Sequence, residues 1–201
     1  MGQLTGFRGA VNGSVQTSYT DQPRRAYPGQ LAFSSDENLL DAVIVGDANG
    51  IFAGQGVRLD VNTSTEDGNM QTPNVLANQP LGNDTDTAAT FGGIVVFEEG
   101  MQSDSLGNPG WNQGRVARVM RPKRAGGRIY VQAPDAVVLN TSTVNWVIEV
   151  GSDGLHPLGS FASTALAGNS TVGYSVAIPM AVWVSACAAG GIACIELGAI
   201  S

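Results

Sequence analysis

VAIPMAVWVSACAAGGIACI, residues Val176 to Ile195, is the stretch that decides the fold, because about twenty residues without a charge either cross a bilayer or fill a core. No Lys or Arg follows Arg128, so the positive charge that orients a membrane span is missing. Pro179 and the pair Gly190-Gly191 interrupt the run. We therefore expect a buried β-hairpin rather than a membrane helix.

The glycine pair predicts a register for this hairpin. Strands Ala181 to Cys187 and Ile192 to Leu197 would be joined at Gly190-Gly191, which tolerates the positive φ of a tight turn. Cys187 would then face Cys194. Because alternate residues of a strand point to opposite faces, one face is wholly apolar and predicted to be core: Val182, Val184, Ala186, Ala193, Ile195 and Leu197. The other face is predicted to contact another subunit: Trp183, Ser185, Cys187, Cys194 and Glu196.

The composition is typical of a β protein. The 201 residues include 27 Gly, 9 Pro and a single Lys, and only 13% are charged, whereas a quarter is usual. The length allows one domain with a sizeable core, or a smaller domain that carries an arm. Apolar runs of strand length alternate with turn signals: Leu39 to Val45, Val57 to Val61, Phe91 to Phe97, Val116 to Met120, Ile129 to Val131, Val137 to Leu139 and Val144 to Val150. We predict an all-β fold, a jelly-roll-like β-sandwich or barrel.

The beginning of the chain differs from the rest. Residues 1–25 hold few apolar side chains and many Gly, Ser and Thr, so we expect an extended N-terminal arm followed by a single β domain at residues 26–201. The long polar stretch from Asn62 to Thr90 is predicted to be a surface loop. The only predicted helix is short, around Ser34 to Leu40, where Ser35 could cap a turn.

The charge distribution points to a protein partner. The net charge of −7 repels nucleic acid and anionic lipid at long range. Eight acidic residues and no basic ones lie between Leu59 and Gly114, whereas six of the ten basic residues lie between Arg115 and Arg128. This basic segment has two interpretations, a charged strand edge that is merely solvated or a docking site for an acidic protein surface.

The chain offers little that could support catalysis or bind a metal. His156 is the only histidine and is predicted to be a surface turn residue, so we do not expect a Ser-His-Asp triad, and a metal site would need other ligand types to supply the rest. Asp84-Thr85-Asp86 lacks the glycine and the last acidic ligand of a calcium loop. Gly54-Gln55-Gly56 is interpreted as a turn before a strand. We expect no catalytic residue, metal site or cofactor, and no enzyme activity.

The cysteines can be interpreted once the compartment is considered. Met1 to Ala10 has no apolar stretch of a secretory signal, so we expect synthesis in a reducing cytoplasm. The predicted register would allow a disulfide between Cys187 and Cys194. A loop this short would gain little from closure, so we expect two free thiols.

Three quoted segments together resemble the structural cement, or head decoration, proteins of tailed bacteriophages. They are VQTSYTDQPRRAYPGQLA, starting at Val15, GRVARVMRPKRAGGRIYVQA, starting at Gly114, and LGSFASTALAGNSTVGYSVAIPMAVWVSACAAGGIACIELG, starting at Leu158. Each consists of apolar strands around glycines, and their order over most of residues 15–198 carries the resemblance. The polar stretch from Asn62 to Thr90 departs from the compact members of the family.

The resemblance implies a non-enzymatic β protein on the outer surface of the virion capsid, assembled in the host cytoplasm. Its partner would be the major capsid protein, whose neighbouring capsomers it would tie together, and it would form a homotrimer or homodimer without contact to nucleic acid or membrane. We expect the capsid contacts to be basic: Arg8, Arg24, Arg25, Arg121, Lys123 and Arg124. The alternative is a carbohydrate- or receptor-binding β-sandwich of a phage tail or surface structure. It needs an exposed aromatic platform, which the scattered Trp111, Trp146 and Trp183 do not suggest.

Overall fold

The computed structural model describes residues 27–33, 39–45, 50–58, 90–103, 109–112, 114–122 and 126–198. Every helix or strand assigned within these ranges is a β-strand, so the predicted all-β class is confirmed. The predicted arm and nearly all of the predicted loop from Asn62 to Thr90 lie outside the described residues.

The strands form four open antiparallel sheets, each named here after one of its inner strands. The β9 sheet has the order β1 (Leu31–Phe33), β9 (Gly127–Gln132), β15 (Ile192–Leu197) and β14 (Ala181–Trp183). The β10 sheet has the order β11 (Phe161–Ala162), β10 (Asn145–Val150), β13 (Gly173–Ala177) and β12 (Ala167–Asn169). The β8 sheet has the order β2 (Leu39–Ile44), β8 (Val116–Met120), β5 (Phe91–Val95) and β4 (Gly56–Arg58). The β7 sheet has the order β3 (Ile51–Phe52), β7 (Pro109–Trp111) and β6 (Gln102–Ser103).

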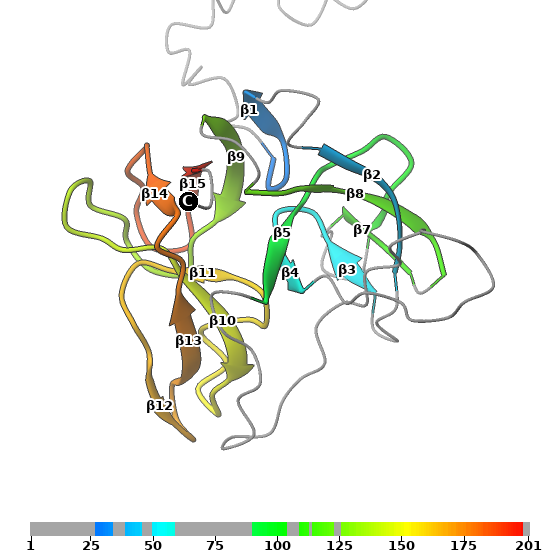
Figure 1. Ribbon diagram of the computed structural model, residues 1–201. Helices are drawn as coiled ribbons and strands as arrows, with labels where there is room; N and C mark the ends of the chain where they lie inside the picture. Colours follow the sequence, from blue (N-terminus) through cyan, green and yellow to red (C-terminus); the bar gives the residue numbers. More distant parts are fainter. Residues whose placement is uncertain are drawn as a thin grey trace, which may run out of the picture.

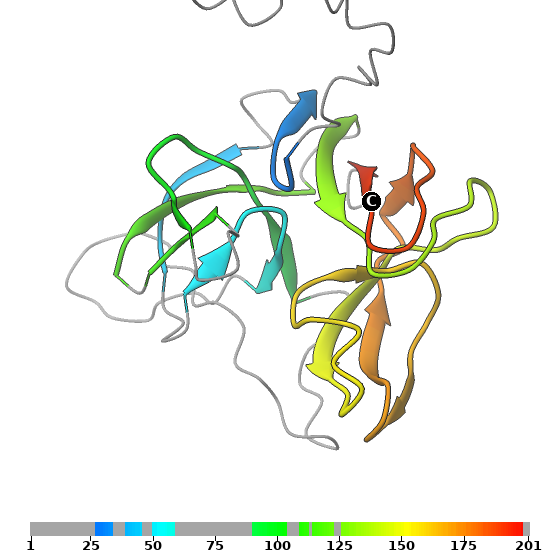
Figure 2. The same ribbon diagram turned by 180° about the vertical axis from the view of Figure 1, so that it is seen from behind.

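The four sheets surround one interior (Figures 1 and 2). Both views show the β9 sheet above the β10 sheet, with the β8 and β7 sheets beside them. A single cluster of buried apolar side chains draws on all of these sheets. Its aromatic centre joins the β8 and β10 sheets, because the ring of Phe91 meets those of Trp146 and Phe161 edge to face at centroid distances of 5.3 and 6.2 Å. Edge-to-face geometry suits the aromatic quadrupole and adds to the hydrophobic stabilisation.

Gly29 holds the β9 and β8 sheets together through its backbone. Its N–H donates to the carbonyl of Tyr130, and its carbonyl accepts from the N–H of Phe97, at 2.7 and 2.8 Å. A Cβ at this position would lie 2.8 Å from backbone atoms of Gly54, Val95 and Phe97, and its φ of 81° is one that side chains disfavour. Only glycine therefore fits this junction without strain.

Several sequence-based strand predictions are confirmed, and two predictions are wrong. The strand predicted at Val116 to Met120 is β8, and that at Leu39 to Val45 is β2. The predicted helix is wrong at its end, because Leu39 and Leu40 pair with β8; the rest of it lies outside the described residues. Val137 to Leu139 is not a strand, since Val137 makes only an isolated bridge with Cys187.

The hairpin register predicted from the glycine pair is also wrong. Leu197 pairs with Ala181 rather than with Val184, a shift of three positions. The reason is that the chain leaves the hairpin after β14: Cys187 pairs with Val137, and the N–H of Gly190 donates to the carbonyl of Ala133 at 2.9 Å. An odd shift exchanges the two faces of a strand.

The exchange of faces alters what β14 contributes to the core. Trp183 points inward and is 7% exposed, whereas Val182, which we expected in the core, is 55% exposed. The core positions predicted on β15 are confirmed, because Ala193, Ile195 and Leu197 are fully buried.

Candidate interaction surfaces

Of the six basic residues predicted to contact a partner, the structure describes one. Arg121 follows β8 and is half-buried, and its Nε atom has no hydrogen-bond partner among the described residues. The segment after it leads from the β8 sheet to the β9 sheet, as the predicted strand, basic turn and strand require. The remaining five lie outside the described residues: Arg8, Arg24, Arg25, Lys123 and Arg124.

The other arginines of the basic segment differ in their surroundings. Arg118 lies 3.8 Å from Glu98, and Arg128 donates from Nε to Glu196 at 2.7 Å. Arg115, at the start of β8, is exposed. Surface ion pairs contribute at most about 1 kcal/mol, so these pairs orient side chains and neutralise charge more than they stabilise the fold.

The five residues predicted to contact another subunit do not share one exposed face. Trp183 is buried and donates from its indole N–H to the carbonyl of Thr143 at 2.8 Å. Cys194 is buried, and its backbone N–H donates to the hydroxyl of Ser185 at 2.8 Å. Cys187 lies opposite Val137. The register that grouped these residues is wrong, and their role in subunit contact stays a prediction.

Cys187 and Cys194 are not joined by a disulfide, and burial lowers the reactivity of Cys194. The pKa of the Cys194 thiol is raised to about 11, chiefly by burial; Arg128 opposes the rise, and Glu196 adds to it. Because the thiolate is the reactive form of cysteine, Cys194 is inert at neutral pH. Cys187 is half-buried.

One row of side chains runs across the outer face of the β9 sheet and was missed by sequence reasoning. Cα pairing connects Phe33 of β1 to Arg128 of β9, Arg128 to Glu196 of β15, and Glu196 to Val182 of β14. We call these four residues the outer row. Phe33 and Val182 are 62% and 55% exposed. Sequence reasoning singled out only Glu196 for subunit contact, because the row depends on strands from three separate parts of the chain: β1, β9 and the β14–β15 hairpin.

His156 is not the surface turn residue that the sequence predicted. It is 7% exposed, and its Nε2 lies 3.0 Å from a carboxylate oxygen of Asp135. The other carboxylate oxygen of Asp135 accepts from the backbone N–H of Ser163 at 3.4 Å. The pair therefore fastens the loop before β11 to the segment after β9. Asp135 compensates the burial of Nε2, whereas the buried Nδ1 has no hydrogen-bond partner among the described residues.

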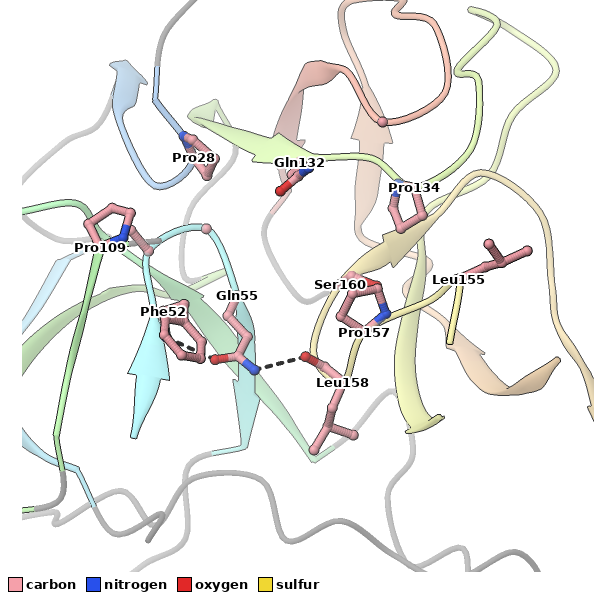
Figure 3. Close-up of a pocket in the computed structure, with 13 residues that line it drawn as sticks. Pro28, Phe52, Gln55, Pro109, Gln132, Pro134, Leu155, Pro157, Leu158 and Ser160 are labelled. Atoms are coloured by element: carbon pink, nitrogen blue, oxygen red, sulfur yellow. Dashed lines mark hydrogen bonds between the residues drawn. The ribbon is translucent and has the colours of Figure 1, made fainter. Parts of the chain in front are cut away.

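A pocket of about 320 Å³ opens beside this pair, between the β3–β4 turn and the loop before β11 (Figure 3). Gln55 joins its two walls, because the side chain accepts from the N–H of Phe52 at 3.0 Å and donates to the carbonyl of Leu158 at 2.8 Å. Four prolines line the pocket: Pro28, Pro109, Pro134 and Pro157. Its walls are largely apolar, and the described residues that line it include Ser160 but no Asp, Glu, His, Cys or Lys.

We also looked for metal sites, membrane-spanning helices and exposed aromatic platforms among the described residues. Within the described residues, no group of three or more His, Cys, Asp and Glu could hold a metal ion. The part of the chain that the structure describes contains no helix able to cross a membrane. Trp146 and Trp183 are buried and Trp111 is half-buried, so none of the three tryptophans offers an exposed stacking platform.

Comparison with known proteins identifies the family and the fold. The family model described as "Structural cement protein (E217 gp24/Pam3 gp6)" matches residues 15–198. A chain in the solved structure "The capsid of Myoviridae Phage XM1" superposes with a TM-score of 0.57 at 14% sequence identity, over 90% of this chain and 95% of that chain. At this identity the superposition shows similarity of fold. A search of curated proteins finds no match.

Proposed function

Because this chain belongs to the phage structural cement protein family, we propose that it binds the outer surface of the major capsid protein shell and bridges neighbouring capsomers. Family membership alone makes it a structural protein of the virion, associated with the capsid. The match of the family model to residues 15–198, which includes every described strand, is the observation that carries the proposal. We further propose that it joins the capsid in the host cytoplasm and acts without enzyme activity.

The physical basis of the proposed function is linkage. A protein that binds the assembled shell and not the separated subunits stabilises the shell by mass action. A bridging protein adds contacts across the boundaries between capsomers, where the outward pressure of packaged DNA would separate them. No chemical step is needed, in keeping with a family of structural proteins.

The proposed capsid contacts are the six basic residues named above, which would face acidic patches of the shell. The chain as a whole is acidic, with a net charge of −7. A local basic cluster would orient it toward an acidic surface and raise the rate of association.

Co-sedimentation with empty shells tests these contacts. The variant with all six charges reversed (Arg8→Glu, Arg24→Glu, Arg25→Glu, Arg121→Glu, Lys123→Glu and Arg124→Glu) should lose occupancy. The wild-type occupancy should fall with salt, because exposed charges are screened within about 10 Å at 0.1 M. Arg115→Glu is a control for a single reversal outside the set, since Arg115 is exposed at the opposite end of β8 from Arg121. Unchanged occupancy of the sixfold variant would refute the assignment of these contacts, whereas absence of wild-type binding would refute the function.

A further inference from the structure

The outer row has an order of chemical types that is complementary to its own reverse. From β1 to β14 it runs apolar, positive, negative, apolar: Phe33, Arg128, Glu196 and Val182. The ion pair in the middle is short, at 2.7 Å, and the Arg128 side chain is 50% exposed. Exposed apolar side chains flank it on both sides, at the two edge strands of the sheet. The row therefore combines exposed apolar surface with a defined pattern of charge.

We infer that the outer row is the centre of a contact between two copies of this chain, related by a two-fold axis. A two-fold contact brings the same patch of both copies together, so the patch must be complementary to itself. When the row is reversed against its own copy, Arg128 faces Glu196 of the second copy and Phe33 faces Val182. Both charges and both apolar ends then find suitable neighbours.

Electrostatics also selects the direction of the axis. An axis parallel to the strands, between β9 and β15, reverses the order of the strands and places opposite charges face to face. An axis along the row would instead place Arg128 against Arg128 and Glu196 against Glu196, and like charges in an interface are costly. Both arrangements keep the strand axes of the two copies aligned, as in packed sheets, so the charges alone select the first one.

The residues next to the outer row can extend the contact. Tyr130 and Gln132 follow Arg128 at alternate positions of β9, so they lie on the same face, and Gln132 is exposed. Because Cys194, opposite Tyr130, is buried beneath this face, the thiol is not part of the contact. The inference thus replaces four members of the sequence-based set, Trp183, Ser185 and the two cysteines, with Phe33, Arg128 and Val182, and it retains Glu196.

The proposal concerns the free protein and does not depend on capsid binding. Light scattering or sedimentation of the purified full chain, without shells, should give the mass of a dimer or of another oligomer with an even number of 20.7 kDa chains. A monomer at the highest soluble concentration, or a trimer, would contradict a two-fold contact. Either result would leave shell binding untouched, so failure of this inference is distinguishable from failure of the proposed function.

Two single charge reversals give the decisive test. Arg128→Glu makes the middle of the row doubly negative, and Glu196→Arg makes it doubly positive, so each variant should repel its own copies and become monomeric. Mixed together, the two variants should form a one-to-one complex, because doubly negative then meets doubly positive. Arg115→Glu, an exposed reversal on the β8 sheet, should leave the dimer intact.

The mixture also excludes simple misfolding, because a variant that cannot fold would not be rescued by a second folded chain. Single variants that remain dimeric, or a mixture that remains monomeric while both chains keep their wild-type circular dichroism, would overturn the proposal. A second pair of variants addresses the apolar ends. Val182→Thr should weaken dimerisation at least several-fold, whereas Val138→Thr, at a position 57% exposed outside the row, should not. Equal effects of the two would also contradict the contact.

Discussion

The two faces of the β9 sheet use the same four strands for different purposes. On the inner face, Cα pairing aligns Leu31, Ile129, Ile195 and Trp183, and the last three are almost completely buried. On the outer face the neighbouring row holds Phe33, Arg128, Glu196 and Val182, with large exposed fractions at both ends. The inner row is explained by the fold of one chain. The outer row leaves two large apolar side chains exposed, Phe33 and Val182, which a partner could cover.

The first way to test this comparison is to truncate one residue on each face. Trp183→Ala should lower the free energy of unfolding by about 3–5 kcal/mol, because it leaves a large cavity and removes the hydrogen bond to Thr143. Val182→Ala, one residue earlier, should cost less than about 1 kcal/mol in dilute protein, because the side chain is exposed. Urea denaturation measures both. Similar losses for the two variants would contradict the faces assigned to β14.

Cys194 offers a second test of the two faces, because it is buried although it lies on the outer side of the sheet. With a thiol pKa of about 11, compared with 9.0 for an ordinary thiol, the folded protein holds roughly a hundredfold less thiolate at pH 8. Alkylation of native protein at pH 8 should therefore modify Cys187 well before Cys194, as peptide mass analysis can show. In urea the two should react at similar rates. Equal rates in the native protein would contradict the burial of Cys194.

The same pKa shift predicts how stability depends on pH. Since the folded-state pKa is raised, the protonated thiol is favoured by folding, and its contribution is complete below pH 9 and lost as pH rises through 11. Wild-type protein should lose stability over this window more steeply than Cys194→Ala. Parallel pH profiles would argue against a buried thiol.

Gly29→Ala tests the junction between the β9 and β8 sheets. We expect a loss of about 1–3 kcal/mol, because alanine is strained at the φ of 81° and its Cβ would press on three backbone atoms. Gly154→Ala is the control: it also has a positive φ but has no atom within 4 Å of the added Cβ. Thermal denaturation should show the larger loss at Gly29, and equal losses would mean that the close approach does not matter.

The smallest expected effect concerns the ion pair of the outer row. Glu196→Gln should lower the unfolding free energy of dilute protein by less than about 1 kcal/mol, because exposed pairs are screened. The difference should vanish in high salt. Glu99→Gln, at an exposed position, provides the baseline. A loss of several kcal/mol would mean that the outer row helps to fold the chain and is not reserved for a partner.

Sequence reasoning identified strands more accurately than their pairing. The short apolar run VARVM located β8 without error, since a run of strand length bounded by turn signals is a local property of the sequence. The face of Trp183 could not be found in this way. It depends on the bridge between Cys187 and Val137, fifty positions apart, which ends the hairpin early and shifts its register.

The surroundings of single polar residues were equally hidden in the sequence. His156 looked like a turn residue because it precedes a proline among glycines. Its burial depends on Asp135, which lies 21 positions earlier and is brought close only by the meeting of two sheets. The basic cluster was visible from composition, but its contact with Glu98 and Glu196 required the fold. Family membership, in contrast, was correctly inferred from the order of three segments over most of the chain.

The disruption temperature of empty capsid shells tests the central claim most directly. Calorimetry would compare shells alone with shells saturated by the purified chain, with occupancy checked by sedimentation. We predict that the bound protein raises the disruption temperature, and that the rise follows occupancy as mass action requires. An unchanged temperature at full occupancy would contradict a cementing role.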